Sequence, residues 1–281
     1  MPDFRPPCVL AIAGSDSGGG AGIQADLKAF ARCGVHGMTA VTAVTAQNTV
    51  AVEAVAPVAP QHIVAQVRAV QADIGVDAVK IGMLGSAETT RAVAEALAQV
   101  PAQAPVVLDP VMVAETGGRL LEDDAVHALL TLLVPRADVL TPNLPEARAL
   151  TGAEPEADAQ TLARALHALG PRAVVVTGGH TRDGTDVFYD GERCVALSGT
   201  RHPGGATHGS GCTHSAALAA HLALGRAPLE AARAARAVAE AAIRDGLVGV
   251  GAGAGPVDAL GIARHAAAGA ADGRSPSAHL R

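Results

Sequence analysis

The sequence predicts an α/β fold in which a mostly parallel central sheet is covered by helices on both faces. Short runs rich in β-branched residues alternate with longer Ala-rich stretches of helical period, a pattern typical of parallel strands joined by helical crossovers. The strand-like runs are apolar at consecutive positions, as expected where both faces of a sheet are buried. Hydrophobic residues make up 49% of the 281 residues and charged residues 17%, a composition that excludes disorder for most of the chain.

Five parallel strands and one hairpin are expected. The apolar runs predict strands at 9–13, 78–81, 106–108, 139–140 and 173–177. Residues 186–189 and 194–197 flank a turn at Gly191 and predict an antiparallel hairpin added to the sheet.

Seven helices are expected between and after these strands. Their apolar periodicity predicts helices at 22–31, 60–72, 87–98, 123–133, 157–169, 211–224 and 229–245. No internal repeat and no linker divides the chain, so residues 1–265 are expected to form a single domain. Residues 266–281 carry many small residues, together with Gly, Ser and Pro, so we expect a flexible tail there.

Composition narrows the class of partner. The chain has no Trp, one Tyr and three Phe, so the core must rely on aliphatic side chains, and its net charge is -6. This balance lacks the basic excess of nucleic-acid-binding proteins. The first seven residues hold no apolar signal segment, and no apolar run reaches membrane-spanning length. We therefore expect a cytoplasmic protein with no membrane or nucleic-acid partner, whose four scattered cysteines are free thiols.

A glycine-rich loop at 14–22 follows the first expected strand and opens a helix. Glycines allow a ligand to approach the backbone, and the helix start offers unpaired N–H groups. The loop does not match the dinucleotide fingerprint, because its third glycine would fall at Ile23, and it lacks the Lys-Ser/Thr ending of a P-loop. A ligand-binding loop and a simple tight turn both remain open.

A second glycine loop, Gly209-Ser210-Gly211-Cys212, precedes an Ala-rich helix. Converging N–H groups and the positive end of that helix suit an anion whose charge grows during a reaction. The helix start is also expected to lower the pKa of Cys212, which would let its sulfur take a proton. The alternatives are a thiol that only packs, and a zinc site formed with His208 and His214.

Three polar residues follow expected strand ends, where ligands of open α/β sheets bind. Asn143 and Glu146 form an Asn-x-x-Glu pair, and Asp109 ends an apolar run. Asp109 and Glu146 are candidate ligands of Mg2+, which prefers carboxylate oxygens and would neutralise nucleotide phosphates. The alternative interpretation is that Glu146 caps the next helix and Asp109 caps a turn.

Taken together in this order, these segments resemble the ribokinase superfamily, and within it the hydroxymethylpyrimidine/phosphomethylpyrimidine kinases. The resemblance covers roughly residues 9–263. It is carried by AIAGSD (11–16), GGAGIQAD (19–26), TAQNT (45–49), KIGML (80–84), LDPVMV (108–113), TPNLPEA (141–147) and THGSGCT (207–213). Several long motifs in one order are far more specific than any of them alone.

The resemblance implies a ribokinase-like three-layer fold and a thiamin-biosynthesis kinase. Such an enzyme phosphorylates 4-amino-5-hydroxymethyl-2-methylpyrimidine and then its monophosphate, with ATP as co-substrate and Mg2+ as cofactor. By position, the resemblance assigns pyrimidine binding to Ala21, Asp26, Gln47 and Met83, and nucleotide binding to Asn143, Glu146, Thr177 and Gly179. It assigns catalysis to Cys212 and to the N–H groups of Gly209, Ser210 and Gly211.

The chain departs from the family where lysines are usual. Thr177, Glu115 and the Gly205-Ala206 pair replace them, which leaves Arg119, Arg182 and Arg201 as candidate cations for phosphate. Two other functions therefore stay open: a pyridoxal kinase of the same superfamily, or a pyrimidine-binding protein with impaired catalysis. Apolar helix faces beyond those needed for one layer also predict a homodimer.

Overall fold

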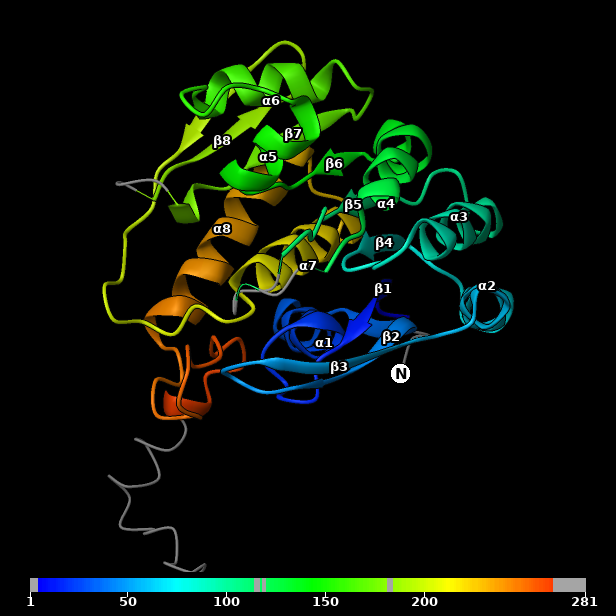
Figure 1. Ribbon diagram of the computed structural model, residues 1–281, viewed down its shortest axis with the longest axis horizontal. Coiled ribbons are helices and arrows are strands. Elements are labelled where there is room, and N and C mark those ends of the chain that lie inside the picture. The colour runs from blue at the N-terminus through cyan, green and yellow to red at the C-terminus, as the bar shows by residue number, and fades with distance from the viewer. Residues whose placement is uncertain (1–4, 114–116, 118–119, 181–183, 265–281) are drawn as a thin grey trace, which may run out of the picture.

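Nine strands form one sheet in the computed structural model, which describes residues 5–113, 117, 120–180 and 184–264 (Figure 1). The strands are β1 (Cys8–Ser15), β2 (His36–Gln47), β3 (Val52–Pro57), β4 (Ala78–Ile81), β5 (Val106–Leu108), β6 (Val139–Leu140), β7 (Ala173–Val176), β8 (Asp186–Tyr189) and β9 (Cys194–Leu197). Their order across the sheet is β3-β2-β1-β4-β5-β6-β7-β8-β9.

The middle of the sheet is parallel and both of its ends are antiparallel. Strands β2, β1, β4, β5, β6 and β7 run in one direction. Strand β3 pairs antiparallel with β2 at one end, and the β8–β9 hairpin completes the other end. The expected parallel strands and the expected hairpin are thus confirmed.

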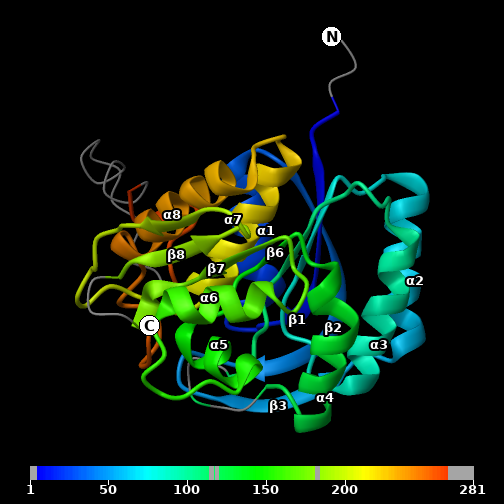
Figure 2. The ribbon, with the colours of Figure 1, turned by 90° about the horizontal axis from the view of Figure 1, so that it is seen from above.

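Helices cover both faces of the sheet. They are α1 (Gly22–Cys33), α2 (Pro60–Asp73), α3 (Ala87–Ala96), α4 (Asp123–Ala128), α5 (Leu144–Thr151), α6 (Ala159–His167), α7 (Ser210–Ala223) and α8 (Pro228–Arg244). Figure 2 shows α1, α7 and α8 gathered on one side, away from α2, α3 and α4. The expected mostly parallel α/β fold with three layers is therefore confirmed.

Two separate cores follow from the alternation of side chains along the strands. Leu10 and Ile12 of β1 point to the core shared with α2 through α6, whereas Val9 and Ala11 point to the core shared with α1, α7 and α8. Small side chains let α7 pack closely in the second core, where residues 216–220 are fully buried. The aliphatic packing expected from the scarcity of aromatic residues is what the structure uses.

Three elements were not expected from the sequence. Strands β2 and β3 form a two-stranded arm, and their Thr- and Ala-rich, partly exposed residues lack the continuous apolar signal of the central strands. Helix α5 has only eight residues, too few for a clear period. The expected helix at 123–133 is α-helical to Ala128 and continues as a π-helix over Leu129–Leu133. The expected tail at 266–281 lies outside the described residues.

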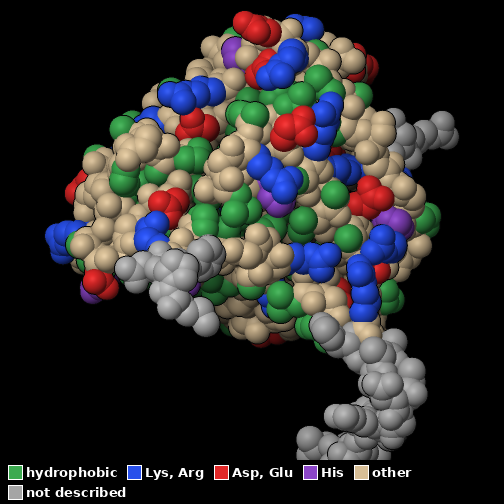
Figure 3. Space-filling model, turned by 180° about the vertical axis from the view of Figure 1, so that it is seen from behind, with side chains coloured by type: hydrophobic (Ala, Val, Ile, Leu, Met, Phe, Trp, Pro, Cys, Tyr) green, Lys and Arg blue, Asp and Glu red, His purple; other side chains and the backbone are tan. Residues whose placement is uncertain are grey.

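The surface carries both signs of charge. On the face in Figure 3, basic and acidic side chains are interspersed rather than gathered by sign. Within the described ranges, no helix combines the length and the apolar character that a membrane crossing needs. All four cysteines are free thiols, as expected.

The parallel strands bring the sequence motifs to one edge of the sheet. Asp16, Met83, Asp109, Asn143 and Thr177 each follow the carboxyl end of a different parallel strand. Because these strands run side by side in the same direction, their ends meet at the edge where open α/β sheets bind ligands.

Candidate active site

A cavity of about 810 Å³ opens at this edge. Twelve of the residues expected at the site line it: Ala21, Gln47, Met83, Asp109, Asn143, Glu146, Thr177, Gly179, Gly209, Ser210, Gly211 and Cys212. The two glycine loops, which lie almost 200 residues apart in the sequence, thus face the same space. The expected Asp26 is not among the lining residues.

Asp26 requires a correction, because it does not reach the cavity. Its carboxylate is fully buried, and its Oδ1 lies 2.8 Å from the Nζ atom of Lys80, which is also fully buried. Lys80 itself lines the cavity. A direct contact between Asp26 and a pyrimidine therefore does not fit this structure, in which Asp26 is paired with the Lys80 ammonium.

Sequence reasoning did not find the role of Lys80. The ammonium fits beneath the cavity because Gly82, two residues along, has no side chain: a Cβ there would lie 2.8 Å from Nζ. Burial raises the pKa of Asp26 to about 6 although Lys80 opposes this. The sequence feature that could have indicated this role is a lysine in an otherwise apolar strand, Lys80, followed two positions later by Gly82 on the same side of the chain.

The first turn of α7 is open toward the cavity. Gly209 precedes the helix with φ 83°, and no side chain caps the helix. A Cβ at Gly209 would overlap the carbonyl oxygen of Gly20, so glycine is required both by the backbone conformation and by the close approach of the two loops. The N–H groups of Gly211 and Cys212 begin a helix whose positive end faces the cavity, an arrangement suited to an anion.

The expectation of a low pKa for Cys212 is wrong. Burial of the sulfur raises the pKa of Cys212 to about 12, and this outweighs the nearby Lys80 ammonium and the N–H group of Gly22, which both lower it. Near neutral pH the group is therefore a thiol. The helix start acts only within the first turn, and here it does not offset desolvation.

Two acids face the cavity from neighbouring strand ends. Asp109 accepts a hydrogen bond of 2.8 Å from the Ser215 hydroxyl. Glu146 is buried and lines the cavity. Burial and the charge of Asp109 raise the pKa of Glu146 to about 8. Burial also raises the pKa of Asp109, although Lys80 opposes this.

The cap interpretation of Glu146 is also confirmed. The Asn143 side chain accepts a hydrogen bond of 2.9 Å from the Glu146 N–H, and the Glu146 carboxylate accepts one of 2.9 Å from the Asn143 N–H. This is a capping box at the start of α5. One carboxylate thus closes the helix and presents oxygen to the cavity. Burial and the negative charge of Asp109 both oppose ionisation of Glu146. A divalent cation that prefers oxygen ligands would relieve this repulsion, so Asp109 and Glu146 fit Mg2+.

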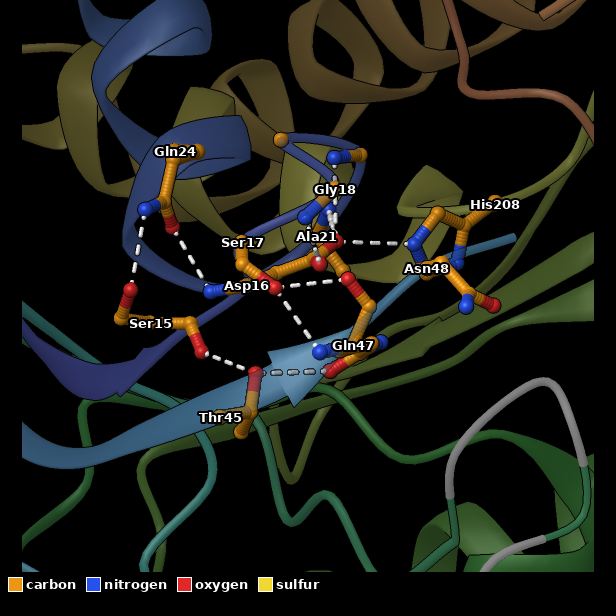
Figure 4. A network of polar contacts seen from close by, with 12 residues as sticks. Ser15, Asp16, Ser17, Gly18, Ala21, Gln24, Thr45, Gln47, Asn48 and His208 are labelled. Atoms are coloured by element: carbon orange, nitrogen blue, oxygen red, sulfur yellow. Dashed lines mark hydrogen bonds and ion pairs between the residues drawn. The ribbon is translucent and has the colours of Figure 1, made fainter. Parts of the chain in front are cut away.

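The other end of the cavity carries the first glycine loop and the end of β2 (Figure 4). The Thr45 hydroxyl donates to the Ser15 carbonyl oxygen at 2.7 Å and lies 3.3 Å from Gln47 Oε1. Ser17 and Gln47 exchange two hydrogen bonds of 2.6 and 2.8 Å. The Ser17 contacts hold the Gln47 backbone, and the Thr45 hydroxyl lies near its side-chain amide. Met83, whose thioether packs against Gly14, lines the same cavity.

Asp16 and His208 were not expected as partners. The Asp16 carboxylate accepts hydrogen bonds from the N–H groups of Gly18, Gly20 and Ala21 at 2.8, 3.0 and 2.8 Å, and lies 2.9 Å from His208 Nε2 (Figure 4). His214 Nε2 instead lies 3.8 Å from Asp186 Oδ2. The two histidines therefore face different acids, and the part of the chain that the structure describes holds no metal-binding cluster of three such residues.

The described positions at which the family usually has lysine, 177 and 205–206, carry no positive charge in this chain. The Thr177 N–H donates to the Pro142 carbonyl oxygen at 2.9 Å, and residues 205 and 206 contribute no charge. Of the arginines considered as substitutes, Arg201 lines the cavity. Glu115, Arg119 and Arg182 lie outside the described residues.

Comparison with known proteins decides the family. The sequence model of the family described as phosphomethylpyrimidine kinase matches residues 16–258. The chain belongs to the phosphomethylpyrimidine kinase family. The expected resemblance is thereby confirmed, and with it the assignment of the chain to a family of phosphotransferases.

Members of this family and related kinases match most of this chain. A hydroxymethylpyrimidine/phosphomethylpyrimidine kinase of Rhizobium meliloti is 49% identical over 254 residues, covering 88% of this chain and 95% of the relative. A thiamine biosynthesis bifunctional protein of Geobacter sulfurreducens is 45% identical over 260 residues, covering 91% of this chain and 52% of that protein. The solved pyridoxal kinase of Staphylococcus aureus in complex with ADP has a TM-score of 0.83 at 34% identity and covers 92% of this chain and 95% of its own. The ribokinase-like fold is confirmed.

Proposed function

We propose that this protein transfers the γ-phosphoryl group of ATP to 4-amino-5-hydroxymethyl-2-methylpyrimidine and then to the resulting monophosphate, in thiamin biosynthesis. The observation that carries the proposal is one cavity in which the Gln47 end and the open start of α7 face each other. The family match and the names of the relatives support the same substrate.

The pyrimidine binds at the Gln47 end. A primary amide offers both a donor and an acceptor to the edge of an aminopyrimidine, and the amide nitrogen of Gln47 has no partner among the described residues. Met83 packs against the ring, a role open to a polarizable thioether where aromatic residues are absent. Ala21, which lines the same wall, leaves room for the ring.

The nucleotide binds along Asn143, Glu146, Thr177 and Gly179, which line the opposite part of the cavity. Asp109 and Glu146 hold Mg2+, which when bound supplies positive charge to the phosphate oxygens. Arg201 supplies a further cation: it lines the cavity, is exposed, and has no carboxylate partner among the described residues.

The first transfer forms a bond between the substrate hydroxyl oxygen and the γ-phosphorus and breaks the bond from that phosphorus to the β,γ-bridging oxygen, releasing ADP. Negative charge on the moving phosphoryl group meets the N–H groups of Gly211 and Cys212, because the Ser210 N–H already donates to the Thr207 carbonyl oxygen at 3.0 Å. Catalysis is therefore chiefly positioning and electrostatics. Because Cys212 is a thiol at neutral pH and a thiol cannot accept a proton, it first releases its own proton to solvent. The thiolate, near the Lys80 ammonium, then accepts the hydroxyl proton as the new P–O bond forms, and the thiol is regenerated.

The second transfer depends less on Cys212. Its nucleophile is a phosphate monoester with a second pKa of about 6, which is mostly dianionic at neutral pH and needs no base. We expect Cys212→Ala to slow the first transfer by about 10²-fold and the second by less than about tenfold. Single-turnover assays of the two steps, with Cys212→Ser as the control, measure this; equal losses in both steps would contradict the assignment.

A second candidate is pyridoxal kinase activity, favoured by the similarity to the solved Staphylococcus aureus enzyme. Turnover measured on the pyrimidine alcohol, its monophosphate and pyridoxal distinguishes the two functions. We expect both pyrimidines to be phosphorylated, because only this activity includes a second transfer. Turnover of pyridoxal alone would overturn the proposal, and pyrimidine binding with no product would show a protein with impaired catalysis.

We further propose a homodimer whose interface includes the β2–β3 arm. Strand β3 is an unpaired edge of the described sheet, and Val44, Val50 and Val55 of the arm are 53, 54 and 48% exposed. An apolar edge strand favours pairing with another chain. Light scattering should give twice the mass of 27.9 kDa, and Val55→Lys should shift it toward the monomer. A cytoplasmic location and a single domain over residues 1–265 stay predictions.

A further inference from the structure

Asp16 and His208 join two loops that are remote in sequence. Both residues are buried, with side-chain exposures of 3 and 7%, and 2.9 Å separates Asp16 Oδ2 from His208 Nε2. Asp16 also fixes the shape of its own loop, because its two oxygens accept three backbone N–H groups of residues 18–21. The imidazole therefore holds a loop that is already rigid.

His208 is equally fixed on its own side. Its backbone N–H donates to the Gly255 carbonyl oxygen at 3.2 Å, and its carbonyl oxygen accepts from the Val257 N–H at 3.0 Å. The next residue, Gly209, is the residue that precedes α7. Any movement of the His208 ring is therefore transmitted directly to the N–H groups at the start of α7.

Two glycines allow the loops to touch. A Cβ at Gly20 would overlap the His208 ring, and a Cβ at Gly209 would overlap the Gly20 carbonyl oxygen. We call residues 14–22 the pyrimidine-side loop and residues 207–212 the phosphate-side loop. At these glycines the two loops meet through backbone atoms and the His208 imidazole, with no flexible side chain between them to absorb a displacement.

We propose that the Asp16–His208 pair is a positioning device for phosphoryl transfer, which fixes the distance between the pyrimidine-side loop and the N–H groups at the start of α7. This inference rests on the proposed function. Neither side chain needs to touch the reacting atoms: Asp16 holds the loop that carries Ala21, and His208 holds Gly209. Displacing reacting groups by about 1 Å costs roughly 10²-fold in rate.

Substitutions of His208 test the pair. His208→Ala should lower kcat for both transfers by about 10²-fold and change either KM by less than about threefold. A Gln amide nitrogen reaches the place of Nε2 and an Asn amide does not, so His208→Gln should recover most of kcat whereas His208→Asn should resemble His208→Ala. Thermal unfolding of each variant accompanies the kinetics.

Three results would overturn the proposal. The first is a kcat of His208→Ala within about twofold of the wild-type value. The second is a kcat of His208→Gln no higher than that of His208→Asn. The third is a loss of kcat that increases from variant to variant as Tm falls, because this would show an effect of lost stability. Wild-type turnover of the pyrimidine, measured in the same assay, separates failure of this inference from failure of the proposed function. If His208→Ala does not fold, the Gln and Asn variants still decide the question.

Gly20→Ala provides an independent test. The added methyl group meets the His208 ring, with Pro256 as a further neighbour at 3.1 Å, and Gly20 has no left-handed conformation that would forbid alanine. We expect Gly20→Ala to lower kcat in the wild-type background and to cause a smaller further loss in His208→Ala, because the obstructing ring is gone. Additive losses in the double variant would show that the two residues act separately.

Discussion

Helices α5 and α7 both begin at the cavity, and their first turns are built in opposite ways. At α5, Asn143 and Glu146 close the helix with a reciprocal pair of hydrogen bonds, and Pro145 has no N–H group to satisfy. At α7, a glycine with φ 83° precedes the helix and no side chain caps it. The first helix start is satisfied by the protein, and the second is left for a ligand.

The difference explains how one edge of the sheet can bind both a cation and an anion. A capped helix start holds carboxylates in place, so the α5 end of the cavity is acidic and suits a cation. An uncapped start presents N–H groups and the positive end of the helix dipole, so the α7 end suits the transferred phosphoryl group. Lys80, buried beneath Cys212 and Asp109, adds positive charge under the α7 end.

The largest effect is expected when α7 is given a carboxylate of its own. In Gly211→Asp, the new side chain competes for the N–H groups of the first turn and repels phosphate, so kcat/KM should fall by about 10³-fold. Stability should stay equal or rise, because an acidic residue in a first turn favours the helix. In the control Gly211→Ala, the Cβ meets open space and activity should stay within about tenfold of the wild type. A Gly211→Asp enzyme that keeps its activity would show that α7 does not bind the anion.

The next effect concerns the cation end. Glu146→Gln keeps the capping box, since Gln also serves at that position, but removes a charged ligand for Mg2+. We expect kcat/KM to fall by about 10²-fold, equivalent to about 3 kcal/mol. Millimolar Mg2+ should raise the Tm of the wild type and not that of the variant. An equal Mg2+ shift in both proteins would contradict the metal assignment.

The same variant has a signature in the pH dependence of stability. The pKa of Glu146 is raised to about 8 in the folded protein, whereas an unfolded Glu titrates near about 4.3. Between these values the folded protein holds a proton that the unfolded chain has released, so stability falls as pH rises through this range. Without Mg2+, the Tm of Glu146→Gln should exceed that of the wild type by several degrees above pH 8. The gap should close below about pH 4.

The smallest effect is expected from the cap alone. Asn143→Ala removes the acceptor for the Glu146 N–H and should cost about 1 kcal/mol, or about 2–4 °C in Tm. Asn143→Ser retains an acceptor and should keep most of the stability. If the Ala and Ser variants melt together, the capping box does not stabilise α5 and the contrast with α7 loses its basis.

The central part of the fold could be predicted because its signals are local. Strands β4, β5 and β6 have the expected bounds, since buried parallel strands are continuous apolar runs. The arm of β2 and β3 escaped prediction because a partly exposed strand such as β3, with five of six residues exposed, carries no such run. Helix α5 is defined by its cap and by the strand end before it rather than by a period.

The site followed the same division. Motif order brought twelve expected residues to one cavity, but the expected contact of Asp26 and the expected low pKa of Cys212 were wrong. Both errors concern burial: Asp26 is covered and paired with Lys80, and the sulfur of Cys212 is desolvated. Burial depends on what the rest of the chain places around a group, and spacing in the sequence does not report it.

By itself, the sequence determined the alternation of strands and helices, the family motifs and the glycines that open the two loops, because these depend on neighbouring residues. Only the tertiary structure decided that Asp16 meets His208, 192 positions away, and that Lys80 neutralises Asp26 beneath the cavity. Such pairings arise when parallel strands bring remote loops to one edge, and the cost of burying an unpaired charge then requires each to find its partner.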